Sequence, residues 1–354
     1  MSDRSIPTSR AYPPKPGPGD RVAVVAPSAG LPQRFPDLHE QGLRRLRDEL
    51  DLVPVEYPTT RILGAPAADR ARDLHAAFAD PDIKAVLAVI GGDDQITVVP
   101  HLDADVFRAN PKPFFGYSDN TNLLHFLWRN GIVGFHGGST MVHLGRGGQT
   151  HPITMASLRA ALFRPGWFEL TVPAEFSDEA LDWNDPVSLR TEPVSRSAPG
   201  GWTWHQPSGV IEAPTWGGNL EIVGWLLMAD RVVPAPPEID GHVLLLETSE
   251  EMPSAEEVFR TLRNMGERGL LGRFSALLMG RAKAWEQNRR TTLAERAVYV
   301  DEQRAAVLRA MAAYNPEATV VFDVDFGHTD PQLIVPYGGQ VRIDSSKRTI
   351  AVRY

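Results

Sequence analysis

The first third of the chain alternates short apolar runs with amphipathic stretches, and this alternation restricts the possible folds more than any other feature of the sequence. Apolar runs of strand length lie at residues 21–26, 52–57, 83–90 and 113–116, and stretches with helical spacing lie at residues 37–50, 67–79 and 121–129. Continuous apolar runs are typical of parallel strands that are buried on both faces. The repeated β-α-β pattern therefore predicts a doubly wound α/β fold, in which ligands bind beyond the carboxyl ends of the strands.

A second α/β segment follows a stretch of weak periodicity. Residues 164–209 are rich in Pro, Ser, Asp and Trp, which is typical of a linker or binding loop. Beyond it we expect strands at residues 208–214, 242–247, 274–280 and 319–324, helices ending near residues 227, 266 and 314, and a hairpin at residues 341–354. These patterns divide the chain into an N-terminal α/β domain (residues 1–165), a linker and substrate loop (166–208) and a C-terminal domain (209–354).

Composition excludes several classes of function. Lys and Arg number 36 against 44 Asp and Glu, and the net charge of -8 gives a phosphate backbone no broad attraction, so we expect no nucleic-acid partner. The absence of cysteine excludes disulfides, zinc–cysteine sites, iron–sulfur clusters and a thiol nucleophile. Residues 1–18 contain no apolar run and no later stretch approaches the roughly 20 apolar residues of a membrane span, so we expect a cytoplasmic protein without a membrane partner.

Three polar residues stand where an apolar strand gives way to a loop: Ser118, Glu247 and His328. A serine hydroxyl is a poor nucleophile at neutral pH, so it needs a base to take its proton and a carboxylate to orient that base. Ser118 lies on a predicted strand-to-helix turn, which would lift its hydroxyl clear of the sheet. The N–H groups of Asp119 and of Gly92, at the end of the preceding strand, are candidates for an oxyanion hole.

Each of these residues also has a simpler interpretation. Ser118 could cap the helix that follows it, His328 could be an ordinary loop histidine, and Glu247 could face water at the end of its strand. Ser139, in a Gly-Gly-Ser-Thr turn, is a rival nucleophile. The ten histidines form no His-x-x-x-His or His-x-His pair, so we expect no metal and no other cofactor.

Two further patterns have competing readings. Glu250 and Glu251 could suggest a glycosidase with two carboxylates, but adjacent side chains do not face each other across a bond to be cut, so we interpret them as the solvated start of a helix. Six of the eight tryptophans lie between Trp167 and Trp225. They could pack between the domains or form a face for an aromatic ligand.

Six motifs, in order, resemble the LD-carboxypeptidase family of serine peptidases; they lie at residues 19–28, 90–94, 112–119, 216–220, 244–247 and 326–329. The resemblance runs from about Gly19 to the C-terminus. It implies an α/β architecture with an N-terminal flavodoxin-like, doubly wound parallel sheet and a smaller C-terminal α/β domain, a homodimer, and no metal. It also implies that Ser118 is the nucleophile, His328 the base and Glu247 the residue that orients the base.

Residues 176–184 look like the extra loop of the microcin C immunity branch of this family. That resemblance implies an aminoacyl-nucleotide-like substrate, with Trp183 stacking on its nucleobase and Asn219 contacting it. Glu251 stands where the founding immunity protein has a basic residue, and Trp216 replaces an aliphatic residue. A negative charge near the substrate disfavours a phosphate group.

The leading hypothesis is therefore a serine peptidase or amidase that cleaves an amide after a small or acidic residue through an acyl-enzyme, as in detoxification of aminoacyl-nucleotide-like peptides. A muropeptide LD-carboxypeptidase of cell-wall recycling is the alternative within the same class. A non-catalytic binding protein that uses the tryptophan-rich cleft is the alternative from another class.

Overall fold

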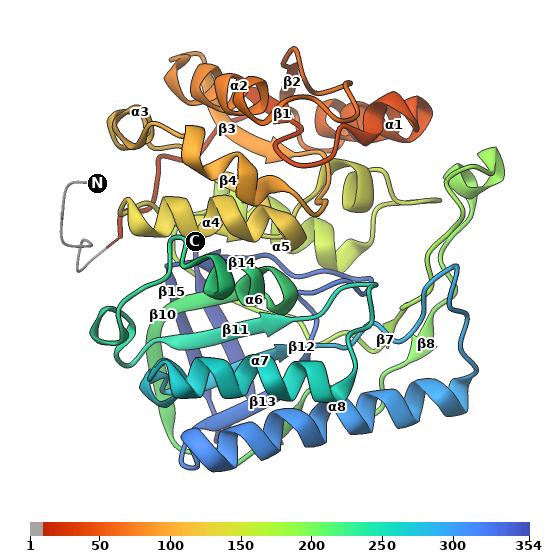
Figure 1. Ribbon diagram of the computed structural model, residues 1–354. Helices are drawn as coiled ribbons and strands as arrows, with labels where there is room; N and C mark the ends of the chain where they lie inside the picture. Colours follow the sequence, from red (N-terminus) through yellow and green to blue (C-terminus); the bar gives the residue numbers. More distant parts are fainter. Residues whose placement is uncertain (1–9) are drawn as a thin grey trace.

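The computed structural model describes residues 10–354, which form two β-sheets with helices packed around them (Figure 1). Residues 1–9 lie outside the described part. The expectation that residues 1–18 contain no apolar run therefore falls partly on residues that the structure does not describe. Among the described residues, no helix is both long enough and apolar enough to cross a membrane.

The first sheet confirms the predicted doubly wound arrangement. Its six strands, in spatial order, are β2 (Val53–Glu56), β1 (Arg21–Val25), β3 (Ile83–Ala88), β4 (Phe114–Gly116), β5 (Gly134–His136) and β14 (Val335–Tyr337). The first five are parallel in the order 2-1-3-4-5, which is the flavodoxin-like order. The order reverses between β1 and β3, and ligands of such sheets bind at this switch point.

Helices cover both faces of the first sheet, as the mainly apolar and buried strands at its centre require. They are α1 (Pro36–Asp48), α2 (Ala67–Ala79), α3 (Ala104–Ala109), α4 (Thr121–Arg129) and α5 (Pro152–Phe163). Successive residues of β1 belong to two separate hydrophobic clusters. Ala23 and Val25 share one cluster with α2, α3 and α4, whereas Val22 and Val24 share the other with α1 and α5.

The second sheet has eight strands and lies below the first in Figure 1. In spatial order they are β6 (Trp167–Glu169), β16 (Thr349–Arg353), β15 (Gln340–Asp344), β10 (Val210–Asn219), β11 (Val243–Glu247), β12 (Ala276–Gly280), β13 (Thr319–Val324) and β9 (Thr203–His205). β10, β11, β12 and β13 are parallel neighbours, and β15 and β16 form the predicted terminal hairpin. A small pair, β7 (Glu175–Phe176) and β8 (Arg196–Ser197), lies in the predicted loop region.

Three helices accompany this sheet: α6 (Leu220–Ala229), α7 (Ala255–Glu267) and α8 (Leu293–Tyr314). Their first turns are capped by side chains, which satisfy backbone N–H groups that have no partner within the helix. Asn219 caps α6, and the predicted capping box of Ser254 and Glu257 begins α7. These capping residues mark the first turns of α6 and α7 in the sequence.

The two halves of the chain share a core and a sheet. Leu123 of α4 lies in the same buried cluster as Leu220 of α6 and Leu244 of β11, and Figure 1 shows α4 and α6 between the two sheets. β14, from the C-terminal part of the chain, pairs antiparallel with β5 at the edge of the first sheet. The division of the chain into domains at residues 165 and 208 stays a prediction. That division does not account for β14, which follows residue 208 but belongs to the first sheet.

Candidate active site

A cavity of about 420 Å³ opens at the switch point of the first sheet. Gly91, Gly92 and Ser118, which follow β3 and β4, form part of its wall. His328, from the loop after β13, lines it from the C-terminal half of the chain, and the loop at residues 180–184 completes it. The structure therefore brings together strand ends that are about 200 residues apart in the sequence.

Ser118 occupies a strained turn. It follows β4 directly and starts the short 3₁₀ turn Ser118–Asn120 that leads into α4. Its φ of 61° is in the left-handed region, which a residue with a side chain rarely adopts. A strained turn of this kind between a strand and a helix presents a serine hydroxyl to the solvent side of the sheet. The simpler reading of Ser118 as a helix cap has no support here, because no side chain caps this turn or α4.

Glycine at position 91 is required by the close approach of Ser118. A Cβ atom on Gly91 would lie 2.9 Å from the Ser118 hydroxyl oxygen and 3.3 Å from the backbone nitrogen of Asp119. The end of β3 is thus in direct contact with the turn that carries the hydroxyl. Gly92 is similarly confined, because its Cβ would lie 2.2 Å from the Ser28 hydroxyl oxygen.

The Asp119 side chain holds this turn in place. Its carboxylate is fully buried and accepts hydrogen bonds from the Ser28 hydroxyl, from the Gln95 backbone N–H at 2.9 Å and from the Asn122 amide at 2.8 Å. Burial raises the pKa of Asp119 to about 6, against the effect of these hydrogen bonds. The carboxylate therefore connects the ends of β1 and β3 to the turn after β4.

Glu247 and His328 form a buried pair. Glu247 ends β11 and is fully buried, and its Oε2 lies 2.5 Å from Nδ1 of His328. Two glycines make room for this carboxylate: a Cβ on Gly280 would lie 2.5 Å from the Glu247 Cβ, and a Cβ on Gly327 would lie 3.0 Å from Oε2. Because Nδ1 is held by Glu247, Nε2 of His328 is the nitrogen left to accept a proton.

The electrostatic surroundings of His328 favour its charged form. Burial lowers the pKa of His328, but the charge and hydrogen bond of Glu247, together with the charges of Glu250 and Glu221, outweigh burial and raise the pKa to about 9. Burial raises the pKa of Glu247, and the attraction of His328 more than offsets it, so this pKa is lowered overall. The two groups are therefore an ion pair at neutral pH.

This pair predicts an alkaline pH dependence. A general base must be neutral to take a proton, so kcat/KM is expected to rise about tenfold per pH unit below pH 8 and to level off near pH 9. The check is the profile of kcat/KM between pH 6 and pH 10. A profile that is already flat above pH 7 would contradict the assignment of His328 as a base with a raised pKa.

Of the three residues predicted to lie near the substrate, one lines the cavity and two do not. Trp183 lines the cavity, and its ring lies 5.4 Å from the ring of Phe35 in an edge-on arrangement. Asn219 is buried and accepts a hydrogen bond from the Ile222 N–H, and it is not one of the residues that line the cavity. Glu251 is exposed and lies outside the cavity wall, whereas its neighbour Glu250 is part of that wall.

Two alternatives from the sequence have structural explanations. The Ser139 hydroxyl is buried and donates a hydrogen bond to the Val89 carbonyl at 2.6 Å, so it is occupied within the fold. Trp216 is buried in the shared core, where its ring lies 4.9 Å from the ring of His125. Trp202 is also buried and donates to Asp325. Trp202 and Trp216 therefore serve packing, whereas Trp183 reaches the cavity.

Several residues near the site were not singled out from the sequence. Tyr117 packs against His328, with ring centroids 4.8 Å apart, and also against His136 and His143. Burial lowers the pKa of His136 to about 4 and that of His143 to about 3, so both rings are neutral. His136 ends β5, as Glu247 ends β11, so the strand-end pattern could have identified it. Lys283, in a loop after β12, has no comparable signal.

Within residues 10–354, no group of three or more His, Asp or Glu side chains is arranged to hold a metal ion. The described site brings together a hydroxyl, an imidazole and a carboxylate, and the N–H groups of Gly92 and Asp119 stay candidates for the oxyanion hole. These are the groups that acyl transfer to a serine requires.

Comparison with known proteins agrees with this class of site. The chain matches the LD-carboxypeptidase N-terminal domain over residues 22–137 and the LD-carboxypeptidase C-terminal domain over residues 212–343. A putative carboxypeptidase of Streptomyces coelicolor is 32% identical over 349 residues, which cover 95% of this chain and 94% of that protein. The chain therefore belongs to the LD-carboxypeptidase family of serine peptidases, as the motifs predicted.

Within the family, the chain is similar to microcin immunity proteins. The microcin C7 self-immunity protein MccF of Escherichia coli is 26% identical over 288 residues, which cover 80% of this chain and 78% of that protein. An MccF-like protein from Streptococcus pneumoniae, solved in complex with AMP, has a TM-score of 0.82 at 25% identity. The matched residues cover 95% of this chain and 99% of the chain of that protein. MccF in complex with glutamyl sulfamoyl guanosine has a TM-score of 0.81 at 22% identity, covering 97% and 98% of the two chains, and supports the same fold.

Proposed function

We propose that this protein is a serine carboxypeptidase or amidase in which Ser118, His328 and Glu247 form the catalytic triad. The observation that supports this most directly is that His328, which is hydrogen-bonded to the buried Glu247 at 2.5 Å, lines the same cavity as the strained Ser118. Its substrate is an amide on the carboxyl side of a small or acidic residue, and the leaving group is aromatic and nucleotide-like.

The reaction follows from the roles of these groups. Nε2 of His328 takes the Ser118 proton while Oγ attacks the amide carbonyl carbon. The N–H groups of Gly92 and Asp119 stabilise the negative charge that develops on the carbonyl oxygen. The C–N bond breaks as His328 protonates the leaving nitrogen, and water then hydrolyses the acyl-enzyme with His328 again acting as the base.

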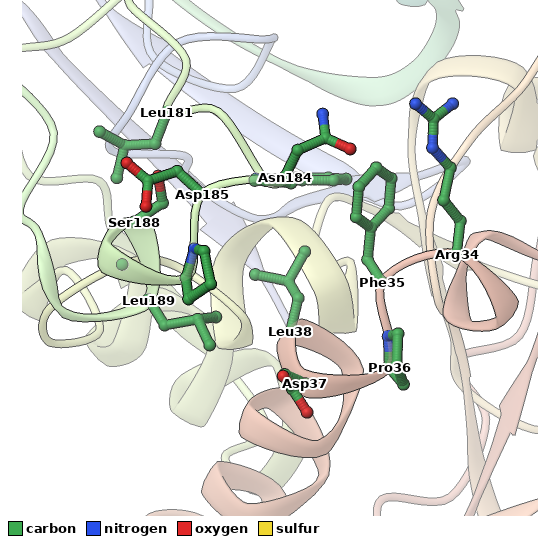
Figure 2. Close-up of a pocket in the computed structure, with 13 residues that line it drawn as sticks. Arg34, Phe35, Pro36, Asp37, Leu38, Leu181, Asn184, Asp185, Ser188 and Leu189 are labelled. Carbon is green, nitrogen blue, oxygen red and sulfur yellow. The ribbon is translucent and has the colours of Figure 1, made fainter.

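The position of Trp183 supports an aromatic leaving group. Trp183 lines the catalytic cavity and also a second cavity of about 230 Å³ next to it. In Figure 2, the start of α1 with Phe35 and Leu38 faces the loop that carries Leu181 and Asn184 across this second cavity. Trp183 and Phe35 together provide apolar surface on which a nucleobase could stack. Relatives in this branch have been solved with AMP and with an aminoacyl sulfamoyl nucleoside.

The function is tested by labelling and by turnover. A fluorophosphonate probe should modify the wild-type protein at Ser118, as located by mass spectrometry of the digested protein. Hydrolysis of aspartyl and glutamyl sulfamoyl adenosine should then be compared with hydrolysis of a muropeptide tetrapeptide. Absence of labelling would leave the non-catalytic binding protein as the better reading, and a preference for the tetrapeptide would favour the cell-wall alternative.

Replacing Trp183 with alanine should mainly raise KM. Base–aromatic stacking contributes roughly 1–3 kcal/mol, so we expect KM for aspartyl sulfamoyl adenosine to rise about tenfold while kcat changes little. Trp167→Ala is a suitable control, because Trp167 is 39% exposed, packs under Arg342 and lies outside both cavities. If Trp183→Ala has the kinetics of the wild type, Trp183 has no part in binding the leaving group.

The expected homodimer and the cytoplasmic location stay predictions. Sedimentation of the purified protein would measure the first directly.

A further inference from the structure

Glu250 contacts the nitrogen of His328 that the reaction uses. Its Oε2 lies 3.5 Å from Nε2 of His328, on the side of the ring opposite to Glu247. The Glu250 side chain is 56% exposed and lines the catalytic cavity, so it is accessible to a bound molecule. This carboxylate lies beside the nitrogen that acts as the base in the proposed reaction.

The charges of the cavity wall favour a cationic ligand group. Three carboxylates line the cavity, on Asp182, Glu250 and Glu286. The one lysine in the wall, Lys283, is buried, and its Nζ donates to the backbone carbonyls of Asp178 at 3.0 Å and of His328 at 3.4 Å. Its ammonium group thus donates to backbone carbonyls, whereas the carboxylate of Glu250 is exposed in the cavity and accessible to a ligand.

We propose that Glu250 is a specificity and positioning residue: it pairs with His328 Nε2 in the free protein and binds the free ammonium group of an aminoacyl substrate in the complex. The proposal rests on the function proposed above and names one feature of its substrate, an unblocked amino group close to the bond that is cleaved. The sequence-based expectation placed Glu251 near the substrate, whereas this proposal concerns its neighbour Glu250, which lines the cavity.

In this proposal, Glu250 exchanges His328 for the substrate ammonium group when the substrate binds. The exchange allows His328 to become neutral and to act as the base. In the free protein the carboxylate of Glu250 holds His328 in its protonated form, which cannot accept a proton from Ser118. A substrate ammonium group neutralises Glu250 and adds a positive charge near the ring, so both effects favour neutral His328. A substrate with a blocked amine leaves the base protonated.

Among the described residues around His328, Glu250 is the exposed carboxylate that lines the cavity and that a ligand can reach and neutralise in this way. The other charged or titratable groups that face the ring or act on it are Glu247 of β11, Glu221 of α6, His136 of β5, His143 after β5, Tyr117 after β4 and Lys283 after β12. Glu247 and Glu221 are buried, and neither is among the residues lining the cavity. His136 and His143 are neutral.

Labelling by a neutral fluorophosphonate tests the effect on the base without a substrate. In the wild type, the rate of labelling should rise with pH as His328 becomes neutral. In Glu250→Gln, the midpoint of this rise should move to lower pH, and labelling at pH 7 should be roughly three- to tenfold faster. Glu251→Gln is the matched control, since it removes the same charge one residue further along and outside the cavity; its profile should equal that of the wild type.

Paired substrates test the recognition of the amine. Wild type and Glu251→Gln should cleave aspartyl sulfamoyl adenosine in preference to its N-acetyl derivative, and Glu250→Gln should lose about tenfold of this preference, whereas Glu250→Asp should keep part of it. An unchanged labelling midpoint or an unchanged preference in Glu250→Gln would overturn the inference while the triad stands. Failure of wild type to label at any pH would overturn the triad, and this inference with it.

Discussion

Replacing Ser118 with alanine is expected to lower kcat by roughly three to six orders of magnitude, because the proposed acyl-enzyme forms on the Ser118 hydroxyl. His328→Ala should have a loss of similar size. The double variant should lose little more than either single variant, since residues of one catalytic unit do not act additively. Measurements of kcat for aspartyl sulfamoyl adenosine in the three variants provide the comparison.

Ser139→Ala is the control for this series. Ser139 follows β5 and is buried, and its hydroxyl donates to the Val89 carbonyl. We expect its loss to affect stability by about 1 kcal/mol and kcat only slightly. Substantial activity in Ser118→Ala, or a loss in Ser139→Ala as large as that expected for Ser118, would reassign the nucleophile.

Glu247→Gln should lower kcat by roughly three to four orders of magnitude with little change in KM. The amide has nearly the same shape, but it cannot stabilise a protonated His328, and its NH₂ group can turn toward Nδ1 and select the wrong tautomer. Because Glu247 raises the pKa of His328, the remaining activity should reach its plateau at a lower pH than in wild type. The measurement is the pH profile of kcat/KM in both proteins.

Glu221→Gln separates this effect from the general cost of changing a buried carboxylate. Burial raises the pKa of Glu221, and its carboxylate accepts hydrogen bonds from Ser249 without touching His328. We expect at most a few-fold change in kcat. A Glu247→Gln protein that keeps wild-type kcat would show that His328 needs no carboxylate partner.

The sequence predicts the long elements of this fold well, because their own residues determine them. β1, β3, β11 and β13 are mainly apolar and nearly all of their residues are buried, and α7 begins at the capping box that its sequence predicts. The short strands are different. β14 has three residues and pairs with β5, which lies about 200 positions earlier, so no local pattern could indicate its partner.

The candidate site shows the same division. The end of a buried strand can be recognised in the sequence. The structure agrees with the sequence on the two strand ends: Ser118 follows β4, and Glu247 is the last residue of β11. Which side chain of a loop faces the cavity depends on the backbone path, which local composition does not determine. For this reason the sequence pointed to Glu251, and the structure places Glu250 in the wall of the cavity instead.

The pairing of β14 with β5 also affects when the protein can become active during its synthesis. A ribosome makes the chain from the N-terminus, so the sheet that carries Ser118 lacks its outer strand until residues 335–337 have emerged. His328 precedes that strand by only a few residues. A nascent chain therefore has neither the finished first sheet nor the proposed base until residues 328–337 have been made, and shorter nascent chains are expected to have no hydrolytic activity.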